Sequence, residues 1–261
     1  APETSEQPES ADVVQQIVDE ADSGRNAISG NEILADQDTS TPLPSFTSTG
    51  LQGADLDNPT SLQFGPDGRL YVAQQSGTIY AYEIERNSET DYQVTDTEVI
   101  DEIVEDIPNH DDDGSLNTSV TERLVTGIYV TGTSENPVLY VTSSDPRIGG
   151  GSEGTDTPLD TNSGVLSRLQ WNGTGWNHTQ LVRGFPRSEE NHAANGIQID
   201  EANETMYIAV GGNTNKGATS NNFAYLPEYA LSAAVVSVDL ATIGNSTYDI
   251  PTLNDTETPF G

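Results

Sequence analysis

Short apolar runs alternate with polar residues in the segment 59–84, and turn sequences separate these runs. GPDG at Gly65–Gly68 and Ser76-Gly77 are typical of tight turns, because proline fixes one φ angle and glycine accepts positive φ. The pattern predicts three antiparallel strands joined by hairpins. The run VTDTEVI (94–100) predicts a fourth strand.

The same phrase occurs three times along the chain. It starts at Leu62, Ile128 and Ile197, and each time an apolar-polar-apolar triplet is followed by a turn and by an apolar-Tyr-apolar triplet. Further strand-like runs follow at 164–171 and 233–239. A four-strand unit repeated at a nearly constant spacing is typical of propeller blades, whereas a β-sandwich gives no reason for the repeat.

The predicted fold class is therefore all-β, a partial β-propeller of about three four-stranded blades. The blades are expected near 57–105, 120–175 and 190–250, with long loops inserted at 143–162 and 211–230. Closed propellers have about four to eight blades, so three would leave open faces and an open edge. We therefore expect a complementary C-terminal half, or another chain, to close the ring of the propeller domain 46–261.

Residues 1–45 differ from the rest of the chain in composition. They begin with a Glu-, Ser- and Pro-rich stretch, typical of a solvated segment. Val13, Val14, Ile17 and Val18 then follow at helical spacing, over a length that is marginal for an independent helix. We expect an acidic tail or a short helix, and favour a tether over a partner-binding helix.

The charge of the chain excludes several function classes. It has 42 Asp and Glu against 9 Lys and Arg, a net charge of −33. Nucleic acids and anionic lipids are bound by basic surfaces, so neither is an expected partner, and no apolar run is long enough for membrane insertion. The aromatic and β-branched residues in alternating runs argue against a disordered acidic chain. Adaptation to concentrated salt, which screens the self-repulsion, is the favoured interpretation.

The start of the chain and its sequons indicate export. The chain opens with a small, polar stretch at Ala1, as a secreted protein does once its signal peptide is removed, although an artificially shortened chain would begin in the same way. It has no cysteine, so it has neither disulfides nor thiol chemistry. We expect a glycosylated protein of the extracellular space or cell surface of a halophilic archaeon. Its six N-x-S/T sequons are at Asn117, Asn172, Asn177, Asn203, Asn245 and Asn254.

The run FPRSEENHAANGIQIDEANETMYIAVGG and its continuation to Asp239 carry a family resemblance. Together with NPTSLQFGPDGRLYVAQQSGTIY and RLVTGIYVTG, this region resembles the glucose/sorbosone dehydrogenase family over about residues 55–250. The resemblance implies a six-bladed propeller that uses pyrroloquinoline quinone (PQQ) and calcium to oxidise sugars. In the family, the calcium ligands and an Arg-Asn pair facing the quinone come from later blades, so the resemblance implies that this chain alone does not hold the cofactor.

The resemblance makes His192 the candidate general base. Imidazole is suited to removing the proton of a sugar C1 hydroxyl while hydride leaves for the quinone. Asn191 stands where the family often has a carboxylate, and Glu122-Arg123 stands where it has a Gln that contacts the cofactor. Arg123 is therefore a candidate cofactor-binding residue at a position that departs from the family.

Two further arginines lie in loops where propellers bind ligands. Arg147 and Arg187 could each hold an anionic group through a bidentate guanidinium. The alternative is a local ion pair with Asp145, Glu189 or Glu190.

No metal site is predicted. His110 precedes three adjacent Asp residues, but a calcium loop needs alternating ligands, so a solvated acidic loop is favoured. His178 lies within the Asn177 sequon and is expected at the surface.

Two functions remain open. In the first, the chain is the N-terminal half of a secreted quinone-dependent sugar or aldose dehydrogenase-like propeller, with a sugar as ligand. Alternatively, it is a non-catalytic, glycosylated cell-surface module that binds carbohydrate or builds the envelope. The departures at Asn191 and Glu122-Arg123 favour the second function.

Overall fold

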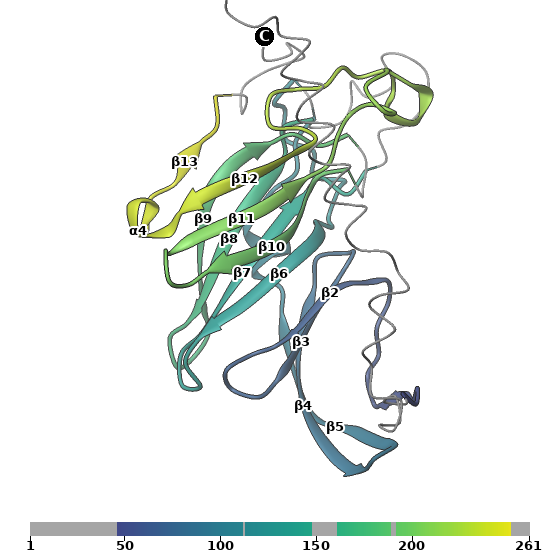
Figure 1. Ribbon diagram of the computed structural model, residues 1–261, viewed down its shortest axis with the longest axis vertical. Coiled ribbons are helices and arrows are strands. Elements are labelled where there is room, and N and C mark those ends of the chain that lie inside the picture. Colours follow the sequence, from purple (N-terminus) through teal and green to yellow (C-terminus); the bar gives the residue numbers. More distant parts are fainter. Residues whose placement is uncertain (1–45, 112, 148–160, 189–191, 252–261) are drawn as a thin grey trace, which may run out of the picture. The chain divides into compact units, whose positions relative to one another are not determined.

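The computed structural model describes residues 46–111, 113–147, 161–188 and 192–251. The chain divides into two compact units, Ala1–Ser48 and Thr49–Gly261. The expected tail or short helix (1–45) lies outside the described residues. The described residues of the second unit form three sheets, which begin one after another along the chain (Figure 1). This is the predicted all-β, partial propeller fold.

The first sheet has five strands in the order β1-β5-β4-β3-β2. Its four antiparallel strands form the first blade, and β1 adds to the outer edge parallel to β5. The fourth strand expected at 94–100 is the greater part of β5. The strands are β1 (Leu51–Gln52), β2 (Pro59–Phe64), β3 (Leu70–Gln74), β4 (Ile79–Ser88) and β5 (Asp91–Ile100).

Both predicted turns of the first blade are confirmed. The backbone N–H of Gly68 donates to the carbonyl of Gly65 over 3.0 Å, and that of Gly77 donates to Gln74 over 3.1 Å. Gly68 has φ +82° and Gly77 has φ +107°, a region that residues with a Cβ rarely adopt.

The second sheet has the order β13-β9-β8-β7-β6. Four antiparallel strands form the second blade, which extends beyond the expected boundary near 175, and β13 adds to its outer edge parallel to β9. The strands are β6 (Leu124–Gly132), β7 (Pro137–Ser144), β8 (Gly164–Trp171), β9 (Trp176–Phe185) and β13 (Tyr248–Asp249).

The third blade has three strands in the described residues, where four were expected: β10 (Ala194–Asp200), β11 (Thr205–Val210) and β12 (Ala234–Asp239). After β12 the chain turns away from this sheet into α4 (Leu240–Ile243). The carboxylate of Asp239 starts α4 by accepting the backbone N–H of Thr242 over 2.8 Å. The chain then continues as β13 on the second blade.

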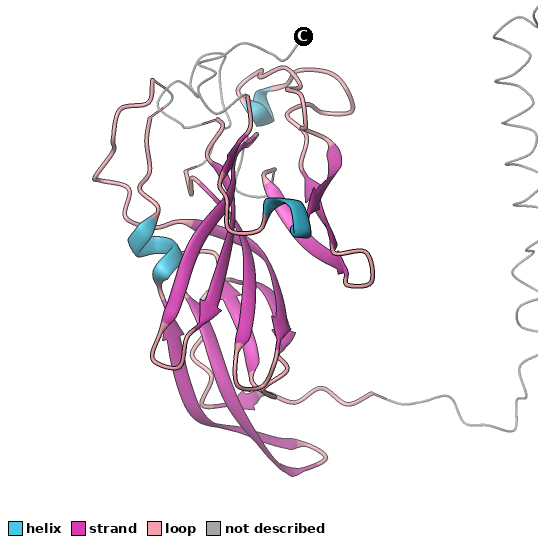
Figure 2. Ribbon diagram, turned by 90° about the vertical axis from the view of Figure 1, so that its left-hand side faces the viewer, coloured by secondary structure: helices cyan, strands magenta, loops and turns pink. Residues whose placement is uncertain are grey.

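The core lies between the blades, in two apolar clusters. Tyr71, Leu139 and Leu169 belong to the cluster between the first and second blades. Leu166 and Met206 belong to the cluster between the second and third. Figure 2 shows the sheets side by side, connected by loops and short helices. Within the described segments, no helix is long and apolar enough to cross a membrane.

Candidate functional site

The buried polar residues gather at one end of the blades. Neighbouring strands within a blade are antiparallel. The starts of β6, β8 and β10 therefore lie at this end together with the ends of β7, β9 and β11. It lies in the upper part of Figure 1, with the long loop that follows β11. We call it the polar end. Its buried polar residues are Asn109, Arg123, Ser143, Ser144, Asp145, Thr161, Asn162, Ser163, Arg187, Ser188 and Asn213.

Arg123 lies between the first two blades and is almost completely buried. Its backbone N–H donates to the carbonyl of Ser76 over 3.1 Å, in the turn of the first blade. Its guanidinium donates to Asn109 Oδ1 over 3.0 Å, to Ser143 Oγ over 3.4 Å, and to the carbonyl of Ser163. A long charged side chain is seldom buried without a specific role. Here it ties loops of both blades together.

Arg147 forms the ion pair that was the alternative to ligand binding. Its Nε lies 3.0 Å from both carboxylate oxygens of the fully buried Asp145, and its Nη1 lies 2.6 Å from Asp111 Oδ1. Burial works against the charge of Arg147, but hydrogen bonds to these two carboxylates raise the pKa of its guanidinium. A hydrogen bond from Asn117 and then the one from Arg147 lower the pKa of Asp111. Arg147 is therefore engaged by local carboxylates.

Arg187 is fully buried and lies in the loop that leads to His192. Its backbone N–H donates to the carbonyl of Thr161 over 2.8 Å, and that of Ser188 donates to the carbonyl of His192 over 3.0 Å. The segment Thr161–Ser163 thus contacts both arginines. Thr161 accepts the backbone N–H of Arg187, and the carbonyl of Ser163 accepts a hydrogen bond from the guanidinium of Arg123. Three predicted residues, Arg123, Arg187 and His192, therefore belong to one continuous polar end.

His192 is half-buried, just before β10. Its Nδ1 lies 2.7 Å from the carbonyl oxygen of Gly212, and its ring packs against Phe223 with centroids 4.6 Å apart. A carbonyl oxygen only accepts hydrogen bonds, so Nδ1 carries the proton in this contact. In neutral imidazole the lone pair is then on Nε2. This is the tautomer that a general base needs.

Two glycines allow close packing at the end of β11, Gly211 against His192 and Gly212 against Glu228. A Cβ on Gly211 would lie 2.6 Å from the Cα of His192, and a Cβ on Gly212 would lie 3.0 Å from Glu228 Oε1. The backbone N–H of Gly211 donates to the carbonyl of Ala193 over 2.9 Å. The Gly211-Gly212 pair thus brings the end of β11 against the start of β10, which positions the Gly212 carbonyl for Nδ1.

Glu228, which sequence reasoning missed, holds the loop after β11 in place. Its carboxylate accepts the backbone N–H of Asn213 over 2.9 Å and the hydroxyls of Thr214 and Ser232 over 2.5 Å each. Burial works against the ionised form, but these hydrogen bonds lower the pKa of Glu228. The run Gly211–Thr214 can be recognised as a loop in the sequence. Its hydrogen bonds to Glu228 depend on how the loop folds back, which the sequence alone does not show.

Three buried polar groups at the polar end lack a partner within the described residues. They are Ser144 Oγ, Ser220 Oγ and the side-chain amide of Asn213, on both its oxygen and its nitrogen. Buried amides are normally hydrogen bonded, so Asn213 stands out among the residues around Gly212.

The described parts of the chain contain no group of three or more His, Asp, Glu or Cys side chains placed to hold a metal ion. The expectation for His178 is wrong: its side chain is 5% exposed and lies 2.9 Å from both Asp106 Oδ2 and Ser167 Oγ. The register of β8 and β9 turns it inward, between the second blade and α3 (Glu102–Asp106).

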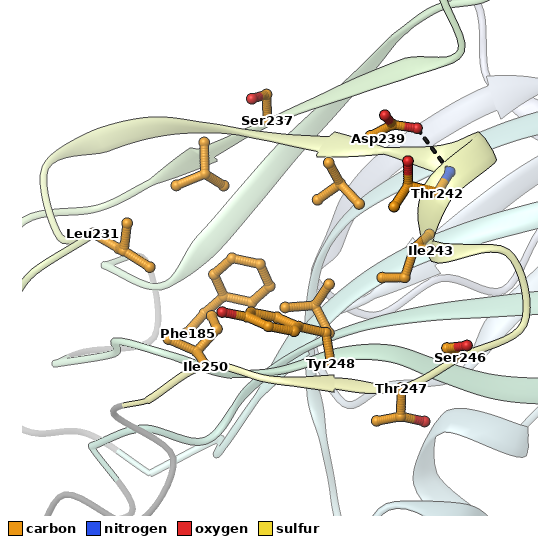
Figure 3. A pocket seen from close by; sticks show the side chains of 13 residues that line it. Phe185, Leu231, Ser237, Asp239, Thr242, Ile243, Ser246, Thr247, Tyr248 and Ile250 are labelled. Atoms are coloured by element: carbon orange, nitrogen blue, oxygen red, sulfur yellow. Dashed lines mark hydrogen bonds between the residues drawn. The ribbon is translucent and has the colours of Figure 1, made fainter.

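A groove of about 460 Å³ lies between the second and third blades (Figure 3). Among the described residues that line it, Asp239 alone is charged, and that carboxylate caps α4 through Thr242. The groove therefore offers apolar contact and no acid, base or cation for catalysis. Most of its apolar lining comes from Val182, Phe185, Leu231, Val236, Val238, Ile243, Tyr248 and Ile250.

Four of the predicted sequons lie at the end of the blades opposite the polar end. Asn172 and Asn177 flank the β8–β9 turn, Asn203 lies in the β10–β11 turn, and Asn245 follows α4. All four are exposed. Asn117 is half-buried in the loop before β6, and Asn254 lies outside the described residues.

The comparisons with known proteins find similar structures only. No family model matches the sequence, and no curated protein matches it. Two structures titled Carbohydrate-Active Enzymes Family AA12 from Trichoderma reesei, one with iodide and one with calcium, match 77% of this chain at 12% identity, with TM-scores of 0.46 and 0.47. The PQQ domain of pyranose dehydrogenase from Coprinopsis cinerea matches 76% at 15% identity, with a TM-score of 0.42. The chain spans 40% of the first two solved chains and 37% of the third.

Proposed function

We propose that this chain is the N-terminal half of a secreted, quinone-dependent sugar or aldose dehydrogenase-like propeller, with His192 as its general base. The observation that carries the proposal is the contact between His192 Nδ1 and the carbonyl of Gly212. It leaves Nε2 with a lone pair, in a residue that follows the buried Arg187 loop.

The chemistry is a two-electron oxidation at the sugar C1. Bound PQQ would supply the acceptor for the hydride that leaves C1. His192 Nε2 takes the proton of the C1 hydroxyl as the carbon–oxygen double bond of the lactone forms. The Gly212 carbonyl holds the ring in position, but it lacks the full negative charge with which a carboxylate would stabilise the imidazolium.

The residues present fit PQQ in part. PQQ carries carboxylates, which a guanidinium holds in a bidentate fork, and Arg187 is buried at the polar end. The guanidinium of Arg123 is already engaged by Asn109, Ser143 and Ser163. The amide of Asn213, which has no partner among the described residues, adds a donor and an acceptor beside the His192 loop. Arg147 does not fit this role, because Asp145 and Asp111 already engage it. We assign any calcium site to the complementary half of the ring.

The test is dye reduction with aldoses by the complete propeller, after addition of PQQ and calcium. We expect His192→Gln to lower kcat by about 10²–10⁴-fold, with PQQ binding retained. The matched control is His178→Gln, which changes an imidazole outside the polar end and should keep the activity. Absence of turnover by the unaltered protein would overturn the enzyme assignment.

A non-catalytic, glycosylated surface module is the second candidate. It is supported by the four exposed sequons at the end away from His192, and by the replacement of the family's carboxylate and Gln at Asn191 and Glu122-Arg123. In this case the protein from the halophilic host would carry glycans at these sequons and bind carbohydrate without turnover. Mass spectrometry of glycopeptides and a carbohydrate-binding assay, alongside the dye assay, separate the two candidates.

A further inference from the structure

The third blade ends on an edge strand. In the described residues, β12 pairs with β11 along its whole length, and no strand pairs with its other edge. The first and second blades each continue to a fourth antiparallel strand, β5 and β9. Apolar edge strands are rarely left open, because their unpaired N–H and carbonyl groups bind other chains. We therefore expect a further segment to cover the edge of β12.

β13 follows β12 and runs in the direction expected of the missing strand, but it lies on the second blade. The carboxylate of Asp249 accepts two hydrogen bonds from the guanidinium of Arg183 in β9, over 2.6 and 2.8 Å. The hydroxyl of Thr247 donates to the carbonyl of Gln180 over 2.7 Å, and the N–H of Ile250 donates to the carbonyl of Arg183 over 2.9 Å. β13 is thus fixed to the second blade rather than to β12.

The groove of about 460 Å³ lies between these two strands (Figure 3). Val236 and Val238 of β12 are half-buried against the cluster between the second and third blades, whereas Val235 and Ser237 alternate with them and are exposed. Side chains of neighbouring strands point to the same face when their residues are paired. A strand beside β12 would therefore place alternate side chains in the groove.

The first interface shows what such a strand contributes. Trp176, the first residue of the fourth strand β9, belongs to the cluster between the first and second blades, and its ring lies 6.3 Å from that of Tyr71 between centroids. Trp171 of β8 packs against the same cluster, with its ring centroid 5.6 Å from that of Trp176. The fourth strand of a blade thus fills the outer part of the interface with the preceding blade. In the second interface this outer part is the groove.

The segments of this sequence that lie outside the described residues do not have the pattern of the missing strand. The apolar run in 1–45, at 13–18, has helical spacing, and neither 148–160 nor 252–261 contains an alternating apolar run. The complementary half of the ring, which the proposed function requires, is the remaining source of such a strand.

We propose that the complementary half contributes an extended strand that pairs antiparallel with β12 as the fourth strand of the third blade. Its alternate residues are apolar and enter the groove. In a chain of net charge −33, β12 presents one carboxylate to this strand, Asp239, which already caps α4. The inference rests on the proposed function, because it names the part of the complementary half that joins the two halves.

The first test is hydrogen exchange of the β12 amides in the complete propeller. In an edge strand, some amides pair with the neighbouring strand and the others point to solvent. We expect both sets in 234–239 to exchange within about tenfold of the amides of β11, which has partners on both sides. If the groove is empty or holds a small apolar molecule, the second set exchanges like exposed loop amides, and the inference is overturned.

A cross-link identifies the donor of the strand. This sequence has no cysteine, so Ser246→Cys places a single thiol on the wall of the groove, where a short thiol-directed photo-cross-linker can be attached. Mass spectrometry of the digest should find this thiol joined to a segment of the complementary half. The matched control is Gln170→Cys: Gln170 is also exposed, but its strand, β8, already has partners on both sides, so no such cross-link is expected.

The outcomes separate this inference from the proposed function. Cross-links that join Ser246→Cys only to 1–45, to 252–261 or to a second copy, or no cross-link at all, overturn the assignment to the complementary half. Dye reduction is measured on the same complete protein without the label. Turnover together with exposed β12 amides overturns this inference alone, whereas protected β12 amides without turnover overturn the enzyme assignment alone.

Discussion

The interface between the first and second blades differs from the one between the second and third in its outer part. In the first interface the apolar cluster continues outward to Ile103 of α3 and to Trp176, whose Nε1 donates to Glu98 over 3.0 Å. In the second interface the outer part is the groove of about 460 Å³ between β9, β13, β12 and α4. The inner parts are alike, since Thr60 and Thr126 make equivalent bonds to the next blade.

The difference shows which contacts belong to the repeat. The inner strands carry the repeated phrase, so both interfaces have apolar residues at equivalent positions and share one hydrogen bond, made by Thr60 in the first and by Thr126 in the second. The outer parts are built by the segments that follow each blade, and these are unrelated in sequence. After the first blade, α3 follows and contacts β9 of the second. After the third blade, α4 and β13 follow and leave the groove.

The largest effect should come from removing a core side chain of the first interface. Leu139→Ala deletes a fully buried side chain, so we expect the free energy of unfolding to fall by about 3 kcal/mol. Ile243→Ala at the half-buried wall of the groove should cost about 1 kcal/mol, because the removed atoms already border open space. Denaturant unfolding in concentrated KCl measures both. Equal losses would contradict the comparison.

The next largest loss of stability is expected where the backbones of the second and third blades approach each other closely. A Cβ in Gly127→Ala would meet the backbone of Asn195, so we expect a loss of about 1–3 kcal/mol and an altered third blade. Gly175→Ala is the control, since no atom lies within 4 Å of its added Cβ. Thermal unfolding of the two variants makes the test, and similar midpoints would contradict the close approach of the two blades at Gly127.

The loop at the polar end of the third blade is stabilised by the negative charge of Glu228. The folded pKa of Glu228 is lowered, so its stabilisation is complete above the ordinary Glu pKa and is lost as the pH falls through the folded value. Glu228→Gln should remove about 1 kcal/mol at neutral pH and flatten this acid limb. Hydrogen exchange of the loop amides, measured against pH, reports the change. A variant with the same pH profile as the unaltered protein would argue against the role of Glu228.

The smallest effect is a gain from filling the groove. Thr242→Leu adds apolar area on the groove wall and keeps the backbone N–H that Asp239 accepts, so we expect a gain of up to about 1 kcal/mol. Thr118→Leu, in an exposed loop, is the control and should give no gain. Chemical denaturation of both variants measures this gain in stability. A gain shared by the control would show that the groove is not its source.

The local pattern was sufficient to predict the turns of the first blade, most of the strands and the order of the blades, but it predicted a fourth strand that the described residues of the third blade lack. Alternation of apolar residues and the turn at Gly65–Gly68 depend on neighbours in the chain, and the thrice-repeated phrase revealed the order of the sheets. The same reasoning placed His192 before a strand of the third blade. These features could be predicted because hairpins and strand faces follow from short-range spacing.

Contacts between segments far apart in the sequence could not be predicted from the local pattern. The inward position of His178 depends on the register of β8 and β9 against α3, and the ionisation of Glu228 depends on a loop that folds back to Asn213. The ion pair of Arg147 with Asp145 was one of two open alternatives, and only the fold selected it. In each case the partner is chosen by packing, which depends on every segment that meets at that place, whereas the period of the strands depends on the backbone alone.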